Sequence, residues 1–340
     1  MSFIPLFPPL TRSNVLACQL SSWYPLFASV SIKTVTIRPL DTEFRNYLLA
    51  DGVQIPQGSE DITARSGLSD DESDEEEDVP SYAFPALDAS IRKAVAAFGA
   101  VFPKLNWSSP KDAAWMLPQS SPLKCTSPAD VYLLLKSSDF VNHDVDPATV
   151  FEGCQEDTDE KDMNYELELS LRKWYAIDRS REFRCFVRDN VLLGASQRDS
   201  NYYEYLNDPQ TQESVLGVID HFWRENIMER CPAGPHYAFD LLLTRDLCRA
   251  HLVDINPFAP RTDPLLFTYE ELQDLVRGAT PRPKLAVIDS AAHVDAARNA
   301  PTFQHNMVPL EALHLAAGRT PHDFNDALVE EIRRSAAEGA

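Results

Sequence analysis

The chain lacks glycine-rich phosphate loops and has only 11 glycines among its 340 residues. Neither the GxxxxGKS/T nor the GxGxxG pattern occurs. P-loop and dinucleotide-binding proteins both need such a loop to bring backbone amides against phosphates, so these two routes to nucleotide binding are excluded. The eight histidines lie in unrelated contexts, and no Ser-His-Asp or Cys-His arrangement is assigned.

The six cysteines are scattered, with no CxxC or His-x-Cys spacing. Such a set predicts free thiols in a reducing compartment rather than a zinc site or a disulfide framework. No apolar run approaches the length of a signal peptide or a membrane span. We therefore expect a protein of the reducing cytoplasm or nucleus, assigned to the cytoplasm, that does not enter a membrane.

Basic residues are scarce: 31 Lys and Arg stand against 52 Asp and Glu, which gives a net charge of −21. This balance disfavours an electrostatic hold on nucleic acid or on anionic lipid, and it favours a protein partner with a basic face.

Two acidic segments are interpreted as solvated insertions. Eight of the nine residues from Asp70 to Asp78 are acidic. They lie in a stretch over 53–80 with almost no aromatic side chains, which predicts disorder because too little apolar surface is available to offset ordering. A shorter acidic loop spans 152–162. Ser69 and Ser73 each precede an acidic residue by three positions, so the first segment is either a solubility insertion or a target of acid-directed phosphorylation.

Strand and helix patterns alternate along the rest of the chain. Period-two alternation and short apolar runs predict strands over 31–38, 100–105, 165–172, 182–187, 191–195, 237–244 and 251–256. Helical spacing predicts helices over 44–48, 87–98, 215–222 and 324–332, and Ser-Pro-x-Asp sequences predict helix starts at Ser109 and Ser127. Because hairpins outnumber crossovers, we expect an α+β fold with antiparallel sheets rather than a doubly wound parallel sheet.

Two of these strand patterns are well defined. From Tyr165 to Arg172, apolar side chains alternate strictly with Glu, Ser and Arg, which predicts a half-buried strand. Asp189 and Asn190 separate two apolar runs and tolerate positive φ, so they predict a two-residue hairpin turn.

Asp254 and Asn256 form the sharpest candidate metal site, because residues two apart on a strand project from the same face. Pairing Thr244 with Ala250 across the preceding turn would set Asp240 opposite Asp254, although a one-residue slip would turn its side chain away. Two carboxylates and an amide suit Mg²⁺, which binds oxygen ligands and completes its shell with water and phosphate. The alternative is that these polar residues cap a turn.

Basic residues are concentrated over 172–184 of this acidic chain, and such a concentration of positive charge suits the binding of a phosphate. The cluster consists of Arg172, Lys173, Arg179, Arg181 and Arg184, with Glu182 among them. Lys104 and Lys136 stand apart, each in apolar surroundings that favour an anionic partner. The alternatives are a solvated basic face for the cluster and surface lysines whose stems lie along apolar surface.

Eight segments along the chain carry a family resemblance. They are CQLSSWYP at 18–25, FPKLNW at 102–107, SSPKDAAW at 108–115, LKSSDF at 135–140, LRKWY at 171–175, SREFRCFV at 180–187, SQRD at 196–199 and VDINPF at 253–258. Together they resemble the cell-division-cycle 123 family, eukaryotic assembly chaperones for translation initiation factor 2. The resemblance implies an ATP-grasp-like fold, in which two α+β lobes with antiparallel sheets hold ATP and Mg²⁺ between them.

The resemblance also implies roles for individual residues. It implies that Lys104 and Lys136 approach the phosphates of the nucleotide. Arg181, Glu182 and Arg184 would complete the phosphate side of the site. An adenine-side hinge would run over 166–173 and include Glu166, Leu169, Leu171 and Lys173. Mg²⁺ would be held by Asp240, Asp254 and Asn256. Asn106 and Trp107 would line the pocket near Lys104 or pack beside it.

The expected organisation follows from these assignments. Residues 1–52 and 81–135 would form the first lobe around the disordered insertion 53–80. Residues 136–310 would form the nucleotide- and metal-binding lobe, and 311–340 a helical tail that either packs on the protein or binds a partner.

The resemblance implies a chaperone that binds ATP and Mg²⁺, binds the C-terminal region of the γ subunit of initiation factor 2, and promotes its joining with the α subunit. Such a role would support translation initiation and cell-cycle progression. No acceptor site for a transferred group is identified, so we expect a binding protein rather than an enzyme. The alternatives are an ATP-dependent ligase or kinase of ATP-grasp type with an unknown acceptor, and a scaffold with a vestigial pocket. Nothing in the sequence demands a dimer, and a monomer is expected.

Overall fold

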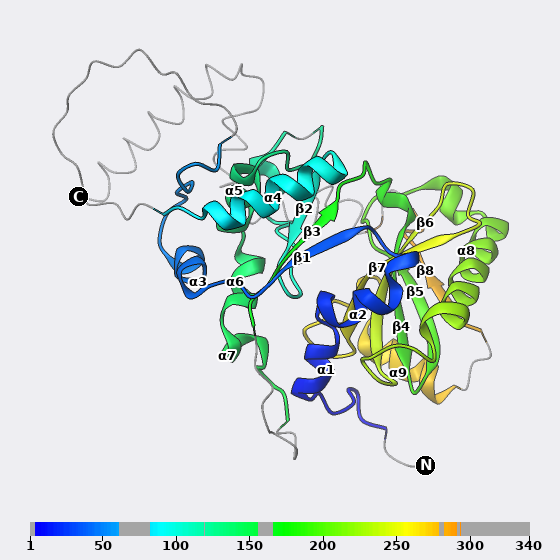
Figure 1. Cartoon of the computed structure of the whole chain (residues 1–340). Coiled ribbons are helices and arrows are strands. Elements are labelled where there is room, and N and C mark those ends of the chain that lie inside the picture. The colour runs from blue at the N-terminus through cyan, green and yellow to red at the C-terminus, as the bar shows by residue number, and fades with distance from the viewer. Residues whose placement is uncertain are drawn as a thin grey trace, which may run out of the picture. The chain divides into compact units, whose positions relative to one another are not determined.

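The computed structural model describes residues 4–60, 82–118, 120–155, 166–278, 282–290 and 293. Most of the acidic insertion, most of the shorter acidic loop and the helical tail expected over 311–340 lie outside these residues. Within them, no helix combines the length and the apolar character that crossing a membrane requires. Two sheets with their helices organise the described chain (Figure 1), and we call them the first lobe and the second lobe.

The first lobe is built on a three-stranded antiparallel sheet in the order β1-β3-β2. Its strands are β1 (Thr34–Ile37), β2 (Val101–Lys104) and β3 (Leu169–Lys173). Its helices are α3 (Thr42–Leu49), α4 (Pro85–Phe98), α5 (Pro128–Lys136), α6 (Asp139–Val145) and α7 (Pro147–Val150). One face of the sheet, with Val101, Leu169 and Leu171, packs against side chains of α3 to α6 in one hydrophobic cluster.

The second lobe is built on a five-stranded sheet in the order β7-β6-β4-β5-β8. Its strands are β4 (Glu182–Arg188), β5 (Val191–Gln197), β6 (Tyr237–Leu243), β7 (Ala250–Pro257) and β8 (Lys284–Ala286). All neighbouring strands are antiparallel except the parallel pair β5 and β8. Its helices are α1 (Arg12–Ala17), α2 (Leu20–Phe27), α8 (Pro209–Phe222) and α9 (Tyr269–Arg277).

Short helical segments complete the two lobes. Segments of 3₁₀-helix cover Ala28–Val30, Ala114–Met116, Arg179–Arg181 and Glu204–Asn207. A π-helix at Trp223–Ile227 continues α8.

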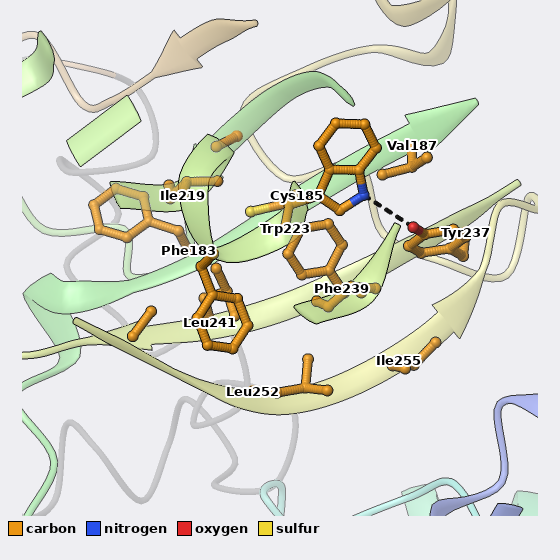
Figure 2. Close-up of a cluster of buried hydrophobic side chains, with 14 of the residues drawn as sticks. Phe183, Cys185, Val187, Ile219, Trp223, Tyr237, Phe239, Leu241, Leu252 and Ile255 are labelled. Carbon is orange, nitrogen blue, oxygen red and sulfur yellow. Dashed lines mark hydrogen bonds between the residues drawn. The ribbon is translucent and has the colours of Figure 1, made fainter. Parts of the chain in front are cut away.

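The two faces of the second sheet differ in character. One face packs against α2 and α8 in a large apolar cluster, part of which Figure 2 shows. There the indole N–H of Trp223 donates a hydrogen bond to the hydroxyl of Tyr237 at 2.9 Å. The opposite face is apolar only in part: Phe186 and Ala238 pack toward α9. Polar side chains of β4, β6 and β7 occupy the remainder of that face.

Several local predictions are confirmed. Asp189 and Asn190 have φ values of 53° and 56° and form the tight turn between β4 and β5. Ser127 caps α5 in a capping box with Asp130. The expected α+β architecture with mostly antiparallel sheets is therefore present.

The helix expected to start at Ser109 does not form, and only the 3₁₀ turn at Ala114–Met116 follows. The reason is the long-range role of Asp112. Its buried carboxylate accepts hydrogen bonds from the hydroxyl of Ser138 at 2.5 Å and from the backbone N–H of Phe140 at 3.2 Å. Asp112 therefore satisfies the start of α6 instead of its own segment.

The expectation of a half-buried β3 is wrong. Ser170 and Arg172, on its polar face, are both 1% exposed. That face also carries Phe102 and Lys104 of β2, and it is covered by the second lobe rather than by water. Buried polar groups need hydrogen-bond or ionic partners, and the basic side chains of this covered face find such partners on the second lobe.

Candidate functional site

The polar face of the second sheet carries a buried ion-pair network. Arg184 on β4 donates two hydrogen bonds to Asp240 on β6, from Nε to Oδ1 at 2.8 Å and from Nη2 to Oδ2 at 3.0 Å. Arg198, just after β5, donates from Nε to Asp240 Oδ2 at 3.2 Å. The same Nε lies 3.5 Å from a carboxylate oxygen of Glu182. Both oxygens of Asp240 are thus held by guanidinium groups.

Charge and burial set the ionisation of this network. Burial alone raises the pKa of Asp240, but the charges of Arg184 and Arg198 outweigh it and hold that pKa well below the usual range. Burial also works against the charge of Arg184, yet the nearby Asp240 raises the pKa of that guanidinium. Lys111 lies near the same charges, and burial together with Arg198 lowers its pKa to about 8. The network therefore combines an ionised Arg184–Asp240 pair with an amine whose pKa is lowered by its surroundings.

A β-bulge brings Asp254 to this face. At the hairpin end the pairs are Leu243 with Ala250 and Leu241 with Leu252, one residue away from the predicted register. The register then shifts, and Asp240 pairs with Asp254 as the sequence predicted. The predicted pairing of these two aspartates is thus confirmed, although the predicted register between them and the turn is wrong.

The first lobe contributes a cation to the same place. Lys104 at the end of β2 has a side chain only 2% exposed, and its Nζ lies 2.6 Å from Asp254 Oδ2. Arg172 on the adjacent β3 donates from Nη1 to the backbone oxygen of Val253 at 2.7 Å. Two neighbouring strands of one lobe therefore contact two consecutive residues of the other.

Asp254 and Asn256 carry oxygen atoms of the kind that Mg²⁺ binds together with phosphate. The second carboxylate oxygen of Asp254 accepts only from the N–H of Ile255, at 3.1 Å, among the described residues. The buried Nδ2 of Asn256, a hydrogen-bond donor that suits a phosphate oxygen rather than a metal, has no partner among the described residues. Mg²⁺ typically takes one or two protein ligands and fills its octahedron with phosphate oxygens and water. The described residues contain no cluster of three or more His, Cys, Asp or Glu suited to a metal, so protein ligands alone would not complete a shell.

Lys136 lies in a different environment from Lys104. Its ammonium donates to the carbonyl oxygens of Tyr47 at 2.6 Å, Leu48 at 3.2 Å and Ala50, at the end of α3. It therefore neutralises a helix C-terminus, an ordinary role for lysine. The structure does not bring it together with Asp254 or Arg184.

The expected hinge residues lie on β3 or just before it, in three surroundings. The side chains of Leu169 and Leu171 are buried in the first-lobe core, and β3 itself is the central strand between β1 and β2. Glu166 is exposed, and its carbonyl oxygen accepts from the amide of Asn106 at 2.8 Å. The ammonium of Lys173 lies 5.2 Å from the ring centre of Tyr175, at the other end of the strand.

Three further predicted residues have structural contacts. The buried Asn106 also accepts from the N–H of Glu168 at 3.1 Å and so links β2 to the start of β3. Trp107 packs at the edge of the second-lobe core, and its indole N–H donates to Val15 at 2.8 Å. Arg181 donates to the carbonyl oxygen of Leu243 at 3.2 Å and thereby holds the end of β6.

The sequence analysis assigned no site role to Arg198 or Lys111, although each lies in a segment that carries the family resemblance. It included Arg172 in the basic cluster suited to a phosphate but did not predict its contact with the second lobe, because alternation cannot distinguish solvent from a second lobe. Arg198 and Lys111 lie just outside regular strands, where residue spacing gives no direction for a side chain. The available signal was their positive charge within otherwise recognisable motifs.

Glu168 is a buried carboxyl at the junction between β3 and α2. Its Oε1 accepts from the hydroxyl of Ser21 at 2.5 Å and from the amide of Gln19, while its buried Oε2 has no partner among the described residues. Burial raises its pKa, and the hydrogen bond from Ser21 lowers it by less. The folded protein therefore binds more protons at Glu168 than the unfolded chain does, and stability falls as pH rises from the usual glutamate range to the raised pKa.

We expect Glu168→Gln to raise the free energy of unfolding by about 1 kcal/mol at pH 7, because the amide keeps the oxygen acceptor and removes the buried charge. Urea unfolding between pH 4 and pH 8 measures the difference. Glu166→Gln is the control, because Glu166 is exposed two residues earlier. Parallel pH profiles of wild type and Glu168→Gln would contradict this account of Glu168.

Comparison with known proteins places the chain in a family. The D123 family model matches residues 23–316. The chain belongs to the D123 family. Translation initiation factor eIF2 assembly protein of Botryotinia fuckeliana is 39% identical over 296 residues, which cover 84% of this chain and 70% of that protein. Cell division cycle protein 123 of Yarrowia lipolytica is 40% identical over 260 residues, covering 76% and 67%.

The solved structure of Cdc123 from Schizosaccharomyces pombe is similar to this D123-family chain, with a TM-score of 0.68 at 35% sequence identity. The match covers 83% of this chain and 100% of that one. The resemblance identified from the eight sequence segments is therefore confirmed.

Proposed function

We propose that this D123-family chain is an assembly chaperone for initiation factor eIF2 that binds ATP and Mg²⁺ between its two lobes. In this proposal it binds the C-terminal region of the γ subunit and promotes its joining with the α subunit, acting as a cytoplasmic monomer. The names of the relatives, eIF2 assembly protein and cell division cycle protein 123, support the assembly role. The observation that carries the nucleotide role is the buried contact of Lys104 with Asp254 across the lobes, beside Asn256.

The residues divide into two sets by charge. Lys104, Arg184 and Arg198 are the cations that would face phosphate oxygens, with Lys111 beside them. Asp254 and Asn256 would hold Mg²⁺, which would neutralise phosphate charge there. Asp240, whose oxygens are both engaged by arginines, orients Arg184 rather than serving as a free ligand. The proposal leaves Lys136 out, because α3 carbonyls hold its ammonium.

This arrangement couples nucleotide binding to the contact between lobes. Lys104 belongs to the first lobe and Asp254 to the second, so a ligand bound by both stabilises one arrangement of the two lobes. A γ subunit that recognises this arrangement binds more tightly when the nucleotide is present. The net charge of −21 favours a basic surface on that partner.

Calorimetric titration with ATP, with and without Mg²⁺, tests the proposal. We expect Lys104→Met to weaken ATP binding at least about tenfold, because a charge-assisted contact to phosphate is lost. Lys136→Met is the matched control: it removes a lysine of the same lobe and should leave ATP affinity unchanged. Equal loss in both variants, or no ATP binding by folded wild type, would contradict the proposal. Release of ADP that depends on an added small molecule or peptide would instead favour the ligase or kinase alternative.

A further inference from the structure

The bulge in β7 determines which face of the second sheet Asp254 occupies. If the register that pairs Leu241 with Leu252 continued, Val253 would stand opposite Asp240, and Asp254 would stand opposite Phe239. The side chain of Phe239 lies in the apolar core of the second lobe. The extra residue at Val253 is thus what moves Asp254 and Asn256 out of that core and onto the polar face.

The packing of β7 agrees with this account. Leu252 and Ile255 both lie in the same apolar cluster, although they are three residues apart. In a regular strand such residues point to opposite faces. A strand that loses the bulge would therefore bury two polar side chains, which favours the bulged register, and a contact with the bulged residue adds to this preference.

Arg172 makes that contact from the other lobe. A bulged residue is left out of the strand ladder, and Arg172 Nη1 donates to the carbonyl oxygen of Val253 at 2.7 Å. The side chain of Arg172 is 1% exposed, and its guanidinium lies 5.5 Å from the ring centre of Phe102. Its Nε and Nη2 are buried without a partner among the described residues. Among the described residues, the guanidinium of Arg172 therefore makes one hydrogen bond, from Nη1 to the bulge.

We propose that Arg172 is a positioning residue for the metal-binding side of the site. By holding the Val253 carbonyl from β3, it fixes the direction of the Asp254 carboxylate, which Lys104 of the neighbouring strand contacts directly. This inference rests on the proposed binding of ATP and Mg²⁺. It adds that the geometry of the second-lobe ligands depends on a first-lobe residue that is not itself a ligand.

The test separates affinity for Mg²⁺ from affinity for ATP. Calorimetric ATP titrations at a series of Mg²⁺ concentrations give the Mg²⁺ concentration that produces half of the full gain in ATP affinity. In Arg172→Met we expect this concentration to rise about tenfold or more, the size of effect found when the support of a metal ligand is removed. ATP affinity without Mg²⁺ should change little.

Arg188→Met is the matched control. Arg188 is also a buried arginine that donates to backbone carbonyls, those of Leu6 at 2.8 Å and Pro5 at 2.6 Å. The Arg188→Met substitution should lower the melting temperature and leave the Mg²⁺ dependence of ATP binding unchanged. If Arg172→Met does not fold, Arg172→Gln replaces it, because the shorter side chain cannot reach the Val253 carbonyl, and the same shift is expected.

The outcomes distinguish this inference from the proposed function. Mg²⁺-dependent ATP binding in wild type, with an unchanged Mg²⁺ requirement in the folded Arg172 variant, would overturn the role of Arg172 and leave the proposed function standing. A wild type whose ATP binding does not depend on Mg²⁺ would overturn both.

Discussion

Asp254→Ala is expected to weaken Mg²⁺-dependent ATP binding by at least about a hundredfold, because it removes the carboxylate that the proposal assigns to the metal. It also leaves the buried Lys104 without its partner at 2.6 Å. Calorimetry with ATP and Mg²⁺ measures the first effect. Affinity for the γ subunit should fall with it, because both depend on the same arrangement of the lobes.

Two further variants make this result interpretable. Asp254→Asn keeps the shape of the side chain and loses its charge, so it should fold well and still bind Mg²⁺-ATP poorly. Asp246→Ala removes an exposed aspartate in the turn between β6 and β7 and should bind ATP as wild type does. Undiminished ATP binding by folded Asp254→Ala would place the metal elsewhere. Unchanged γ-subunit affinity in a variant that has lost ATP would disprove the coupling.

Arg184→Met is expected to lower the free energy of unfolding by about 3–5 kcal/mol, the usual cost of removing one member of a buried ion pair. Asp240 would remain 1% exposed with Arg198 as its remaining cation. Because Arg184 and Arg198 lower the pKa of Asp240, the stabilisation is present above the ordinary aspartate pKa and is lost as pH falls below it. Urea unfolding at pH 7 and pH 3 measures both effects.

The controls for Arg184 use the same chemistry in other surroundings. Arg184→Met combined with Asp240→Leu should be less destabilised than the sum of the two single variants, since no unpaired charge remains. Arg277→Met breaks an exposed pair with Asp274 and should cost less than about 1 kcal/mol. Additive losses in the double variant would contradict a coupled pair.

The sequence allowed most of the strands and the hairpins to be predicted because their signals are local. Asp189 and Asn190 fit a turn with positive φ, and Ser127 fits a helix cap. The helix expected at Ser109 fails because Asp112 binds α6 instead of its own backbone. A capping pattern in the sequence does not show whether its polar side chain binds its own segment or, as Asp112 does, a distant one.

The pairing of Asp240 with Asp254 was predictable from the sequence, but the contacts between the lobes were not. Asp240 and Asp254 face each other as predicted, yet only because a bulge restores a register that is shifted at the turn. Nothing in the local pattern indicates where an extra residue is inserted. Lys104 and Lys136 have similar apolar neighbours in the sequence, and only the tertiary structure separates a lysine at Asp254 from one at the end of α3.

The most direct test of the account is the affinity of this chain for the isolated γ subunit of initiation factor eIF2, measured with ATP and Mg²⁺, with ADP and Mg²⁺, and without nucleotide. The account predicts that ATP with Mg²⁺ strengthens binding at least about tenfold over no nucleotide, within the usual range of coupling between two sites. Equal γ-subunit affinity under all three conditions would contradict it.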